Sequence, residues 1–307
     1  MDLRAVLASE LSKLMKENDK IVVLDADLSK PDGTAPLYKE FPNRCFNCGI
    51  AEANMASVAA GLSAYGFRPI IVTFAPFATR RIFDQIAVSI AYAKQNVIII
   101  GTDPGITAEL NGGTHMSFED IALMRTIPNM LIYDVVDEVQ LAQAVEKLVN
   151  YPGNVYIRMA RKTRPIVFDN NYKFNFLKSD VITEGADLTL IASGTLVYEA
   201  IQAQTKLKEE GINVEVISLN FVKPLDKETL LKSIKKTNHV VTCENHSLNG
   251  GVYSAISEMC ASEYPVRIKG IGVNDEFGQV GKYNELAQAY KLTCDDIVEV
   301  IKKELNK

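Results

Sequence analysis

Short apolar runs alternate with segments of helical periodicity along the whole sequence, and this alternation restricts the fold more than any other feature. In the first run, residues 21–24, four apolar residues stand together and acidic residues follow them. A short run that is apolar throughout is typical of a parallel strand buried on both faces. Strands that alternate with helices predict an α/β fold with a largely parallel sheet. Strands are expected at 21–24, 69–74, 96–100, 130–133, 155–158, 188–192, 214–218, 240–244 and 266–271, and helices at 2–17, 51–64, 79–94, 118–125, 139–149, 196–210, 226–236, 251–261 and 293–305.

The periodic pattern is interrupted between residues 162 and 186, where charged residues, Pro165 and Asn170 replace the regular apolar spacing. We place a linker at 166–186. It separates two predicted domains, a parallel-sheet domain at 1–165 and a smaller α/β domain at 187–307. A chain of 307 residues is long enough for two domains of ordinary size.

Charge and composition exclude several kinds of partner. The net charge is −5 and the chain has no basic footprint, so neither nucleic acid nor an anionic membrane is expected to be a main partner. No apolar run is long enough to span a bilayer, and the first residues lack the pattern of a signal peptide. We therefore expect a cytoplasmic protein. The odd number of cysteines, five, fits reduced thiols in that compartment.

Several common site motifs are absent from the sequence. No strand is followed by G-x-G-x-x-G, and neither G-x-x-x-x-G-K-[ST] nor H-E-x-x-H occurs, which disfavours a dinucleotide dehydrogenase, a P-loop NTPase and a zinc protease. Cys45 and Cys48 form a C-x-x-C pair, but no second pair and no nearby histidine completes a zinc site. We interpret them as two small buried residues, with a redox role as the alternative.

Glu52 is the only charged residue in the run from Asn47 to Gly61. Gly49 can adopt a turn, and the small apolar residues after it predict a helix that packs closely and is buried nearly all round. A carboxylate in the first turn of such a helix would be poorly hydrated, which favours its protonated form and suits a proton shared with a ring nitrogen. The alternative is an acidic residue that merely interacts with the helix dipole.

Phe74 is the last residue of the strand expected at 69–74, and Phe77 follows three residues later. Ligands of α/β proteins bind outside the carboxyl ends of the strands, where two aromatic rings can stack on a planar heterocycle. The alternative is that both rings belong to the core. Arg80 and Arg81 follow, and they are either the solvated start of a helix or ligands of an anion.

The loop from Thr102 to Ser117 contains Gly112-Gly-Thr-His115. Loops of this length in compact domains are usually functional. The paired glycines let the backbone pass close to a ligand, and His115 can form a hydrogen bond with a substrate hydroxyl near neutral pH. A histidine that only fixes its loop is the alternative.

A basic cluster, comprising Arg158, Arg161, Lys162 and Arg164, follows the strand expected at 155–158. The guanidinium fork fits phosphate or sulfonate oxygens. The alternative is a basic linker face that pairs with nearby acidic residues. The segment from Cys243 to Gly251 reads as a strand and a polar turn before a helix, which we assign to structure or an interface rather than to an anion site.

Together these motifs resemble the C-terminal half of the transketolase family of thiamine-diphosphate enzymes. The similarity rests on Gly49-Ile-Ala-Glu-Ala-Asn-Met55, on Thr73-Phe-Ala-Pro-Phe77 and on Gly112-Gly-Thr-His115, and it runs to Asp275-Glu-Phe-Gly278. The resemblance implies a pyrimidine-binding domain followed by a transketolase C-terminal domain. It also implies ketol transfer, of the kind used in the pentose phosphate pathway, from a ketose or its phosphate to an aldose.

The same resemblance assigns roles to particular residues. It implies that Glu52 hydrogen-bonds the aminopyrimidine of the cofactor, that His115 faces the substrate, and that Arg161 and Arg80 hold a distal anionic group. It also implies that Asn111 contacts a sugar hydroxyl. The further residues that it implies for cofactor binding are Asp27, Ile50, Phe74 and Phe77.

Three departures from the family pattern concern the sugar side. Asn111 stands where the family often has Asp, the third pyrimidine-side aromatic is replaced near Arg80, and the loop before His115 is one residue longer. A sulfosugar-specific transketolase therefore fits as well. Three further alternatives are the beta subunit of a 2-oxo acid decarboxylating complex, half of a deoxyxylulose-phosphate synthase, and a non-catalytic protein that stabilises a partner.

The largest departure is an absence, because the G-D-G and metal-holding Asn of the family's diphosphate-binding domain do not occur. The resemblance therefore implies the beta-type subunit of a split enzyme, with an alpha-type subunit that holds most of the Mg²⁺ and the diphosphate in an α2β2 assembly. Sugar phosphates are the expected substrates.

Overall fold

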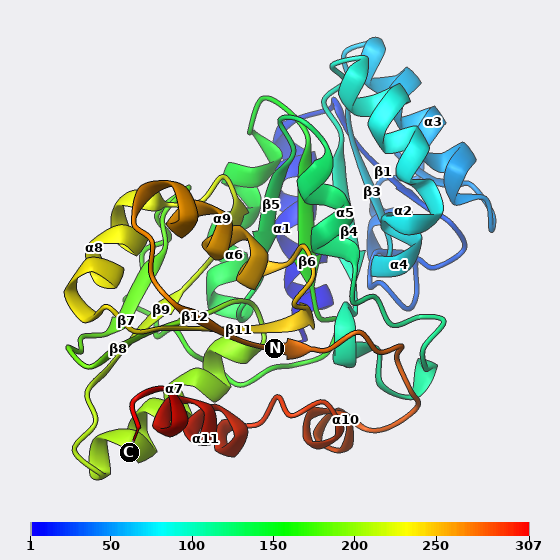
Figure 1. The fold of residues 1–307 in the computed structure, drawn as a ribbon. Helices are drawn as coiled ribbons and strands as arrows, with labels where there is room; N and C mark the ends of the chain where they lie inside the picture. The colour runs from blue at the N-terminus through cyan, green and yellow to red at the C-terminus, as the bar shows by residue number, and fades with distance from the viewer. Residues whose placement is uncertain (1, 307) are drawn as a thin grey trace.

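The computed structural model describes residues 2–306 and contains two β-sheets flanked by helices (Figure 1). The larger, seven-stranded sheet has the order β10-β5-β6-β4-β3-β1-β2, and the smaller, five-stranded sheet has the order β12-β11-β8-β9-β7. Neighbouring strands are parallel except in the pairs β10–β5 and β7–β9. The predicted fold class, two α/β domains with largely parallel sheets, is confirmed. The strands are β1 (Ile21–Asp25), β2 (Cys45–Asn47), β3 (Arg68–Phe74), β4 (Ile98–Thr102), β5 (Leu131–Asp134), β6 (Val155–Met159), β7 (Asp180–Thr183), β8 (Leu188–Ala192), β9 (Val214–Ser218), β10 (Phe221–Lys223), β11 (Val240–Ser247) and β12 (Ile268–Val273).

Helices cover both sheets, and Figure 1 shows α2, α3 and α4 at one end of the molecule and α7, α10 and α11 at the other. Three of the helices have a side-chain cap at their start: the side chains of Asp2, Asp137 and Thr293 accept backbone N–H groups at the starts of α1, α6 and α11. The helices are α1 (Leu3–Glu17), α2 (Ala35–Glu40), α3 (Glu52–Ala64), α4 (Ala75–Ala78), η1 (Arg80–Ile82), η2 (Gln85–Tyr92), η3 (Gly105–Asn111), α5 (Asp120–Thr126), α6 (Glu138–Val149), α7 (Leu196–Glu209), α8 (Lys227–Thr237), α9 (Val252–Glu263), α10 (Tyr283–Ala289) and α11 (Cys294–Glu304).

The structure corrects the sequence prediction in several places. The stretch expected to be helical at 79–94 is helical from Arg80 to Tyr92, but it contains the 3-10 helix η1 and the π-helix η2 and is not a regular α-helix. Strands β2, β7 and β10 are too short to give a periodic pattern and were not expected. Strand β7 lies inside the expected linker 166–186, and β10 leaves the second half of the chain to pair with β5 in the larger sheet. The domain limits 1–165 and 187–307 remain a prediction.

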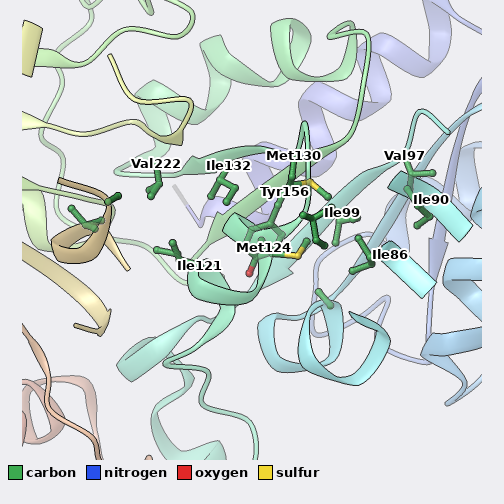
Figure 2. Close-up of a cluster of buried hydrophobic side chains, with 14 of the residues drawn as sticks. Ile86, Ile90, Val97, Ile99, Ile121, Met124, Met130, Ile132, Tyr156 and Val222 are labelled. Atoms are coloured by element: carbon green, nitrogen blue, oxygen red, sulfur yellow. The ribbon is translucent and has the colours of Figure 1, made fainter. Parts of the chain in front are cut away.

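The two halves of the chain share one buried apolar cluster. It covers one face of the larger sheet and continues to residues of the smaller sheet such as Ile191 and Ile217. Figure 2 shows part of this cluster, with Tyr156 among Met124, Met130 and Ile99. A continuous core of this kind fixes the two sheets relative to each other.

Arg158 is the largest fully buried side chain. Its Nε atom donates to Asp120 at 2.7 Å, its Nη1 atom lies 3.4 Å from Asp134, and its Nη2 atom donates to the backbone oxygen of Asn245 at 2.6 Å. Burial alone would raise the pKa of Asp120, but Arg158 and then His246 hold it below its usual value. Burial raises the pKa of Asp134, which has the longer and weaker contact with Arg158. The guanidinium therefore pairs mainly with Asp120.

We predict that Arg158→Leu destabilises the fold by about 3–5 kcal/mol, because it leaves buried carboxylates without their counter-charge. The measurement is the free energy of unfolding in urea at a fixed protein concentration. Arg267→Leu is the matched control, since the Arg267 side chain is 81% exposed and its loss should change stability by less than about 1 kcal/mol. Equal stabilities of the two variants would contradict the assigned role of Arg158.

Candidate active site

The candidate site lies at the carboxyl ends of the central strands of the larger sheet. In the strand register Phe74 stands opposite Thr102, and Thr102 opposite Met159. The loops that follow β3, β4 and β6 therefore leave the sheet side by side. This is the position at which ligands bind in open α/β folds.

Two aromatic rings and a histidine meet at this edge. Phe74 ends β3, and α4 begins directly after it with Pro76 in its first turn, which favours an immediate helix start. The Phe74 and Phe77 ring centroids are 5.8 Å apart. The ring of His115 stands edge-on to both, at 5.8 Å from Phe74 and 5.2 Å from Phe77. The Phe74 ring is only 7% exposed, so it also packs in the core, and the binding of a heterocycle by the two rings remains a prediction.

Glu52 is the first residue of α3 and is only 4% exposed. The turn before it requires Gly49, whose φ is +70°, and the backbone N–H of Gly49 donates to the Asn47 side chain at 2.9 Å. The Glu52 carboxylate accepts a hydrogen bond from Nη1 of Arg81 at 2.5 Å, and the Arg81 guanidinium lies 3.7 Å from the centroid of the Phe77 ring. Glu52 is thus poorly hydrated, as expected, but it has a charge partner that the sequence did not predict.

The prediction that α3 is buried nearly all round is wrong for the chain alone. Met55, Ala56, Ala59 and Ala60 are buried, whereas the opposite face of the helix, which includes Val58, is exposed. The small residues do pack closely against the sheet. They leave an apolar side chain in solvent on the outer face of the helix that begins with Glu52.

The arginines near the rings have acidic partners. Arg161 donates to Asp103 at 2.5 Å, and its guanidinium lies 4.5 Å from the Phe74 ring centroid. Arg80 donates to Glu119 at 2.8 Å and to the backbone oxygen of Thr114 at 2.9 Å. Both cations still have further N–H donors, since a guanidinium carries five. They can therefore bind an anion without leaving their acidic partners.

The remaining predicted site residues lie at the surface. Ile50 is 79% exposed, and Asp27 and Asn111 are also exposed. Asp27 has a φ of +65°, and its backbone N–H donates to the Asn47 side chain at 3.1 Å. These three residues are thus exposed, whereas Glu52 and Phe74 are buried.

Sequence reasoning missed the acidic groups behind the site. Asp32 is fully buried, and its Oδ1 atom accepts a hydrogen bond from the Thr102 hydroxyl at 2.7 Å, while Oδ2 has no partner among residues 2–306. Burial raises the pKa of Asp32 to about 7. Burial also raises the pKa of Asp103, against the opposing effect of Arg161. The position of Asp103 directly after an apolar strand was a usable signal, but no motif marks Asp32.

The described part of the chain, residues 2–306, has neither a metal cluster nor a membrane-spanning helix. No group of three histidine, cysteine or acidic side chains in this range is arranged to hold a metal ion. Nor is any helix in this range both long and apolar enough to cross a bilayer. Cys45 is buried in β2, Cys48 is half-buried after it, and both are free thiols.

Comparison with known protein families gives a match over most of the chain. Residues 1–165 match the family described as transketolase, pyrimidine binding domain, and residues 177–297 match transketolase, C-terminal domain. The chain is 43% identical over 296 residues to the 6-deoxy-6-sulfo-D-fructose transketolase subunit of Clostridium sp. (strain MSTE9), covering 96% of this chain and 92% of that protein.

Two further similarities extend this match. The chain is 34% identical over 305 residues to an apulose-4-phosphate transketolase subunit of Phocaeicola vulgatus, covering 98% of this chain and 97% of the relative. A solved structure described as a split gene transketolase, inactive beta4 tetramer, superposes with a TM-score of 0.92 at 42% identity and covers 100% of this chain and 99% of its own.

We predict that the His115 ring is neutral at pH 7. Burial, and then the positive charges of Arg81, Arg80 and Arg161, lower the pKa of His115 below its usual 6.5. A pH titration of the ring C–H signals by NMR measures this directly, because the chain has only three histidines.

Two variants serve as controls for the titration. His115→Gln identifies the signal, and Arg81→Gln removes one positive charge, so that the midpoint should move up toward the usual histidine value. A midpoint at or above that value in the unmodified protein would contradict the placement of His115 among these cations.

Proposed function

This chain belongs to the transketolase family, and from that premise we propose that it is the beta-type subunit of a split thiamine-diphosphate enzyme. The enzyme transfers a two-carbon ketol unit from a ketose or ketose phosphate to an aldose. The observation that carries the proposal is that this chain has residues for one end of the cofactor but, in the part that the structure describes, no metal site for the other end. Glu52, two aromatic rings and His115 gather at one sheet edge, whereas residues 2–306 contain no group of three histidine, cysteine or acidic side chains fit to hold a metal.

The residues present fit one end of thiamine diphosphate. Glu52 offers a buried carboxylate for a ring nitrogen, and Phe74 and Phe77 offer apolar faces for a planar ring. Thr73, directly before Phe74, has a buried hydroxyl without a partner in the described part of the chain. Within residues 2–306 no group of three histidine, cysteine or acidic side chains is arranged to hold the Mg²⁺ that accompanies a diphosphate, an ion that requires oxygen ligands in near-octahedral geometry.

In the proposed reaction, thiamine diphosphate supplies the nucleophilic carbon chemistry when bound, and this chain binds and orients. Glu52 holds a proton at the ring nitrogen of the aminopyrimidine, and for this its carboxylate has to share or exchange its contact with Arg81. The neutral His115 ring can donate a hydrogen bond to the substrate oxygen that gains charge. Phe74 and Phe77 exclude water from the ring face.

The remaining residues have roles in recognition. Arg161 and Arg80 direct their free N–H donors to the distal anionic group of the sugar, while Asp103 and Glu119 keep them oriented. Of the exposed residues, Asn111 binds a sugar hydroxyl, and Asp27 and Ile50 contact the cofactor.

We infer that an alpha-type subunit supplies the diphosphate-binding domain and most of the Mg²⁺ ligands, in an α2β2 assembly. The exposed apolar side chains support this inference. Val58 and Tyr65 on and after α3 and Val88 and Tyr92 on η2 are exposed by 39% to 87%, and α3 and η2 are in contact. Clusters of this kind mark protein interfaces. Localisation in the cytoplasm and the domain limits 1–165, 166–186 and 187–307 belong to the same proposal.

The second candidate is a transketolase specific for sulfosugars. It is favoured by the 43% identity to a subunit named for 6-deoxy-6-sulfo-D-fructose. Phosphate and sulfonate oxygens can both accept hydrogen bonds from the guanidinium groups of Arg161 and Arg80. The two candidates therefore differ in substrate and not in mechanism. Product analysis of the assembled enzyme with a ketose phosphate, a sulfoketose and a 2-oxo acid distinguishes them. The same assay detects the 2-oxo acid dehydrogenase and deoxyxylulose-phosphate synthase alternatives.

We predict that Glu52→Gln leaves the fold intact and lowers ketol transfer by at least ~10²-fold, because an amide keeps the shape but cannot hold a carboxylate-bound proton. Circular dichroism and turnover of the assembled enzyme measure the two effects. Glu263→Gln is the control, since Glu263 only pairs with Lys227 at the surface. Near-normal turnover of Glu52→Gln would remove Glu52 from the site.

We also predict that this chain alone is inactive. Thiamine diphosphate with Mg²⁺ should bind it weakly in a calorimetric titration, and ketol transfer should appear only after addition of the partner. The partner is to be found by gentle co-purification from source cells followed by mass spectrometry. Turnover by the isolated chain would refute the split-enzyme proposal, and an assembled complex that binds no cofactor would favour a non-catalytic role.

A further inference from the structure

The loop between β4 and α5, residues 103–119, carries Asn111 and His115, and the second half of the chain holds it in place. Its first contact is with Asn245, near the end of β11. The backbone N–H of Ile106 donates to Oδ1 of Asn245 at 2.9 Å, and Nδ2 of Asn245 donates to the backbone oxygen of Pro104 at 3.1 Å. One amide side chain, 1% exposed, thus satisfies both a donor and an acceptor at the start of the loop.

The other end of the loop is held by the same strand. The backbone N–H of Ser247 donates to the oxygen of Phe118 at 2.9 Å. Strand β11 reaches the loop because it is longer than its neighbour β8, whose pairing with it ends at Cys243. After Cys243 the strand no longer pairs with β8, although Ser247 still pairs with Val273 of β12, and these residues contact the loop at both of its ends.

The middle of the loop is in contact with the segment after β12. A Cβ atom on Gly113 would overlap the backbone oxygen of Gly278, so only glycine fits there. The segment is itself fixed, because the hydroxyl of Tyr290 donates to the oxygen of Phe277 at 2.8 Å. The contact at Gly113 lies two residues before His115.

Asn245 is immobilised from both sides. Its backbone oxygen accepts the 2.6 Å hydrogen bond from the buried Arg158. On the loop side Gly105 approaches it closely, with a φ of +55° and with space for no side chain, since a Cβ atom there would overlap Oδ1 of Asn245. Because Asn245 is held in this way, it fixes the position of the 103–119 loop relative to the second half of the chain.

We propose that Asn245 is a positioning residue for His115. It fixes the start of the 103–119 loop, so that the second half of the chain sets where the His115 ring stands relative to the Phe74–Phe77 pair. Asn245 does not touch the substrate, and it acts through the loop backbone. The inference rests on the proposed function only for the catalytic role of His115. The anchoring itself is a property of the isolated chain.

The first test is hydrogen–deuterium exchange of the isolated chain. Asn245→Ala should increase exchange of the amides in 103–118 by at least ~10-fold while the strands keep their protection, because the loop opens locally. Asn213→Ala, at an exposed Asn of the second half, is the matched control and should change nothing. Unchanged exchange in 103–118 would overturn the inference.

A second variant covers the case in which Asn245→Ala fails to fold. Asn245→Asp has the same size and can still accept from Ile106, but it cannot donate to the backbone oxygen of Pro104. We expect the same increase in exchange at the start of the loop. A fully protected loop in Asn245→Asp would overturn the proposal.

The third test is a double-mutant cycle in the assembled enzyme. Asn245→Ala should lower kcat by ~10–100-fold, as expected for a small displacement of a catalytic group, with little change in the affinity for thiamine diphosphate. In a His115→Ala background it should lower kcat no further, because both changes remove the same interaction. Additive losses, or equal losses of kcat and cofactor affinity, would overturn the positioning role.

The two kinds of test separate this inference from the proposed function. Increased exchange in Asn245→Ala supports the anchoring, whether or not the assembled enzyme transfers a ketol unit. Absence of ketol transfer by the assembled enzyme refutes the proposed function and leaves the anchoring intact. Ketol transfer at the normal rate by Asn245→Ala refutes the inference and leaves the proposed function intact.

Discussion

The buried guanidinium of Arg158 is the interaction on which the arrangement of the two halves depends. It lies in the central strand β6, pairs with Asp120 at the start of α5, and donates to the backbone of β11 in the second half. A charge at 1% exposure is tolerable only with full compensation. The need to satisfy it therefore fixes the distance between β6, α5 and β11 and, with it, both ends of the loop that bears His115.

The site itself is assembled from compensated charges. Arg81 pairs with Glu52, Arg161 with Asp103 and Arg80 with Glu119, so that each of these three cations has an acidic partner. This arrangement keeps each long side chain in one orientation, which lowers the conformational entropy lost when an anion binds. It also allows a chain of net charge −5 to bind the anionic sugar that we propose as its substrate. The attraction comes from local, oriented N–H donors and not from the overall field.

The sequence was sufficient for the fold class because buried parallel strands are continuous apolar runs, and every such run expected here is a strand. The prediction failed where the structure depends on contacts between residues that are far apart in the sequence. Strand β10 exists only because Phe221 pairs with Tyr133, and η2 winds as a π-helix although its apolar spacing resembles that of an α-helix. The motifs indicated Glu52 and His115 because their neighbours have a distinctive order.

The supporting residues were not predictable in the same way. Arg81 stands beside Arg80 with nothing in the sequence to show which one meets Glu52, and Asn245 lies 139 residues from its partner Ile106. Such contacts follow from the packing of the halves, which no local pattern encodes.

A site divided between two chains has a thermodynamic consequence for assembly. In the enzyme that we propose, Glu52, Phe74 and Phe77 hold one end of the cofactor, so the complete set of contacts forms only in the complex. A ligand that binds the complex and not the separate chains stabilises the complex by about 2.7 kcal/mol at a hundredfold excess over its Kd. By reciprocity, the factor by which saturating ligand strengthens assembly equals the factor by which the partner raises the affinity of this chain for the ligand. The exposed face of α3 is part of this coupling, because the helix that begins with Glu52 also carries the apolar side chain of Val58 that a partner would cover. In the proposed assembly, partner binding and cofactor binding would both act on α3, which would couple the two events.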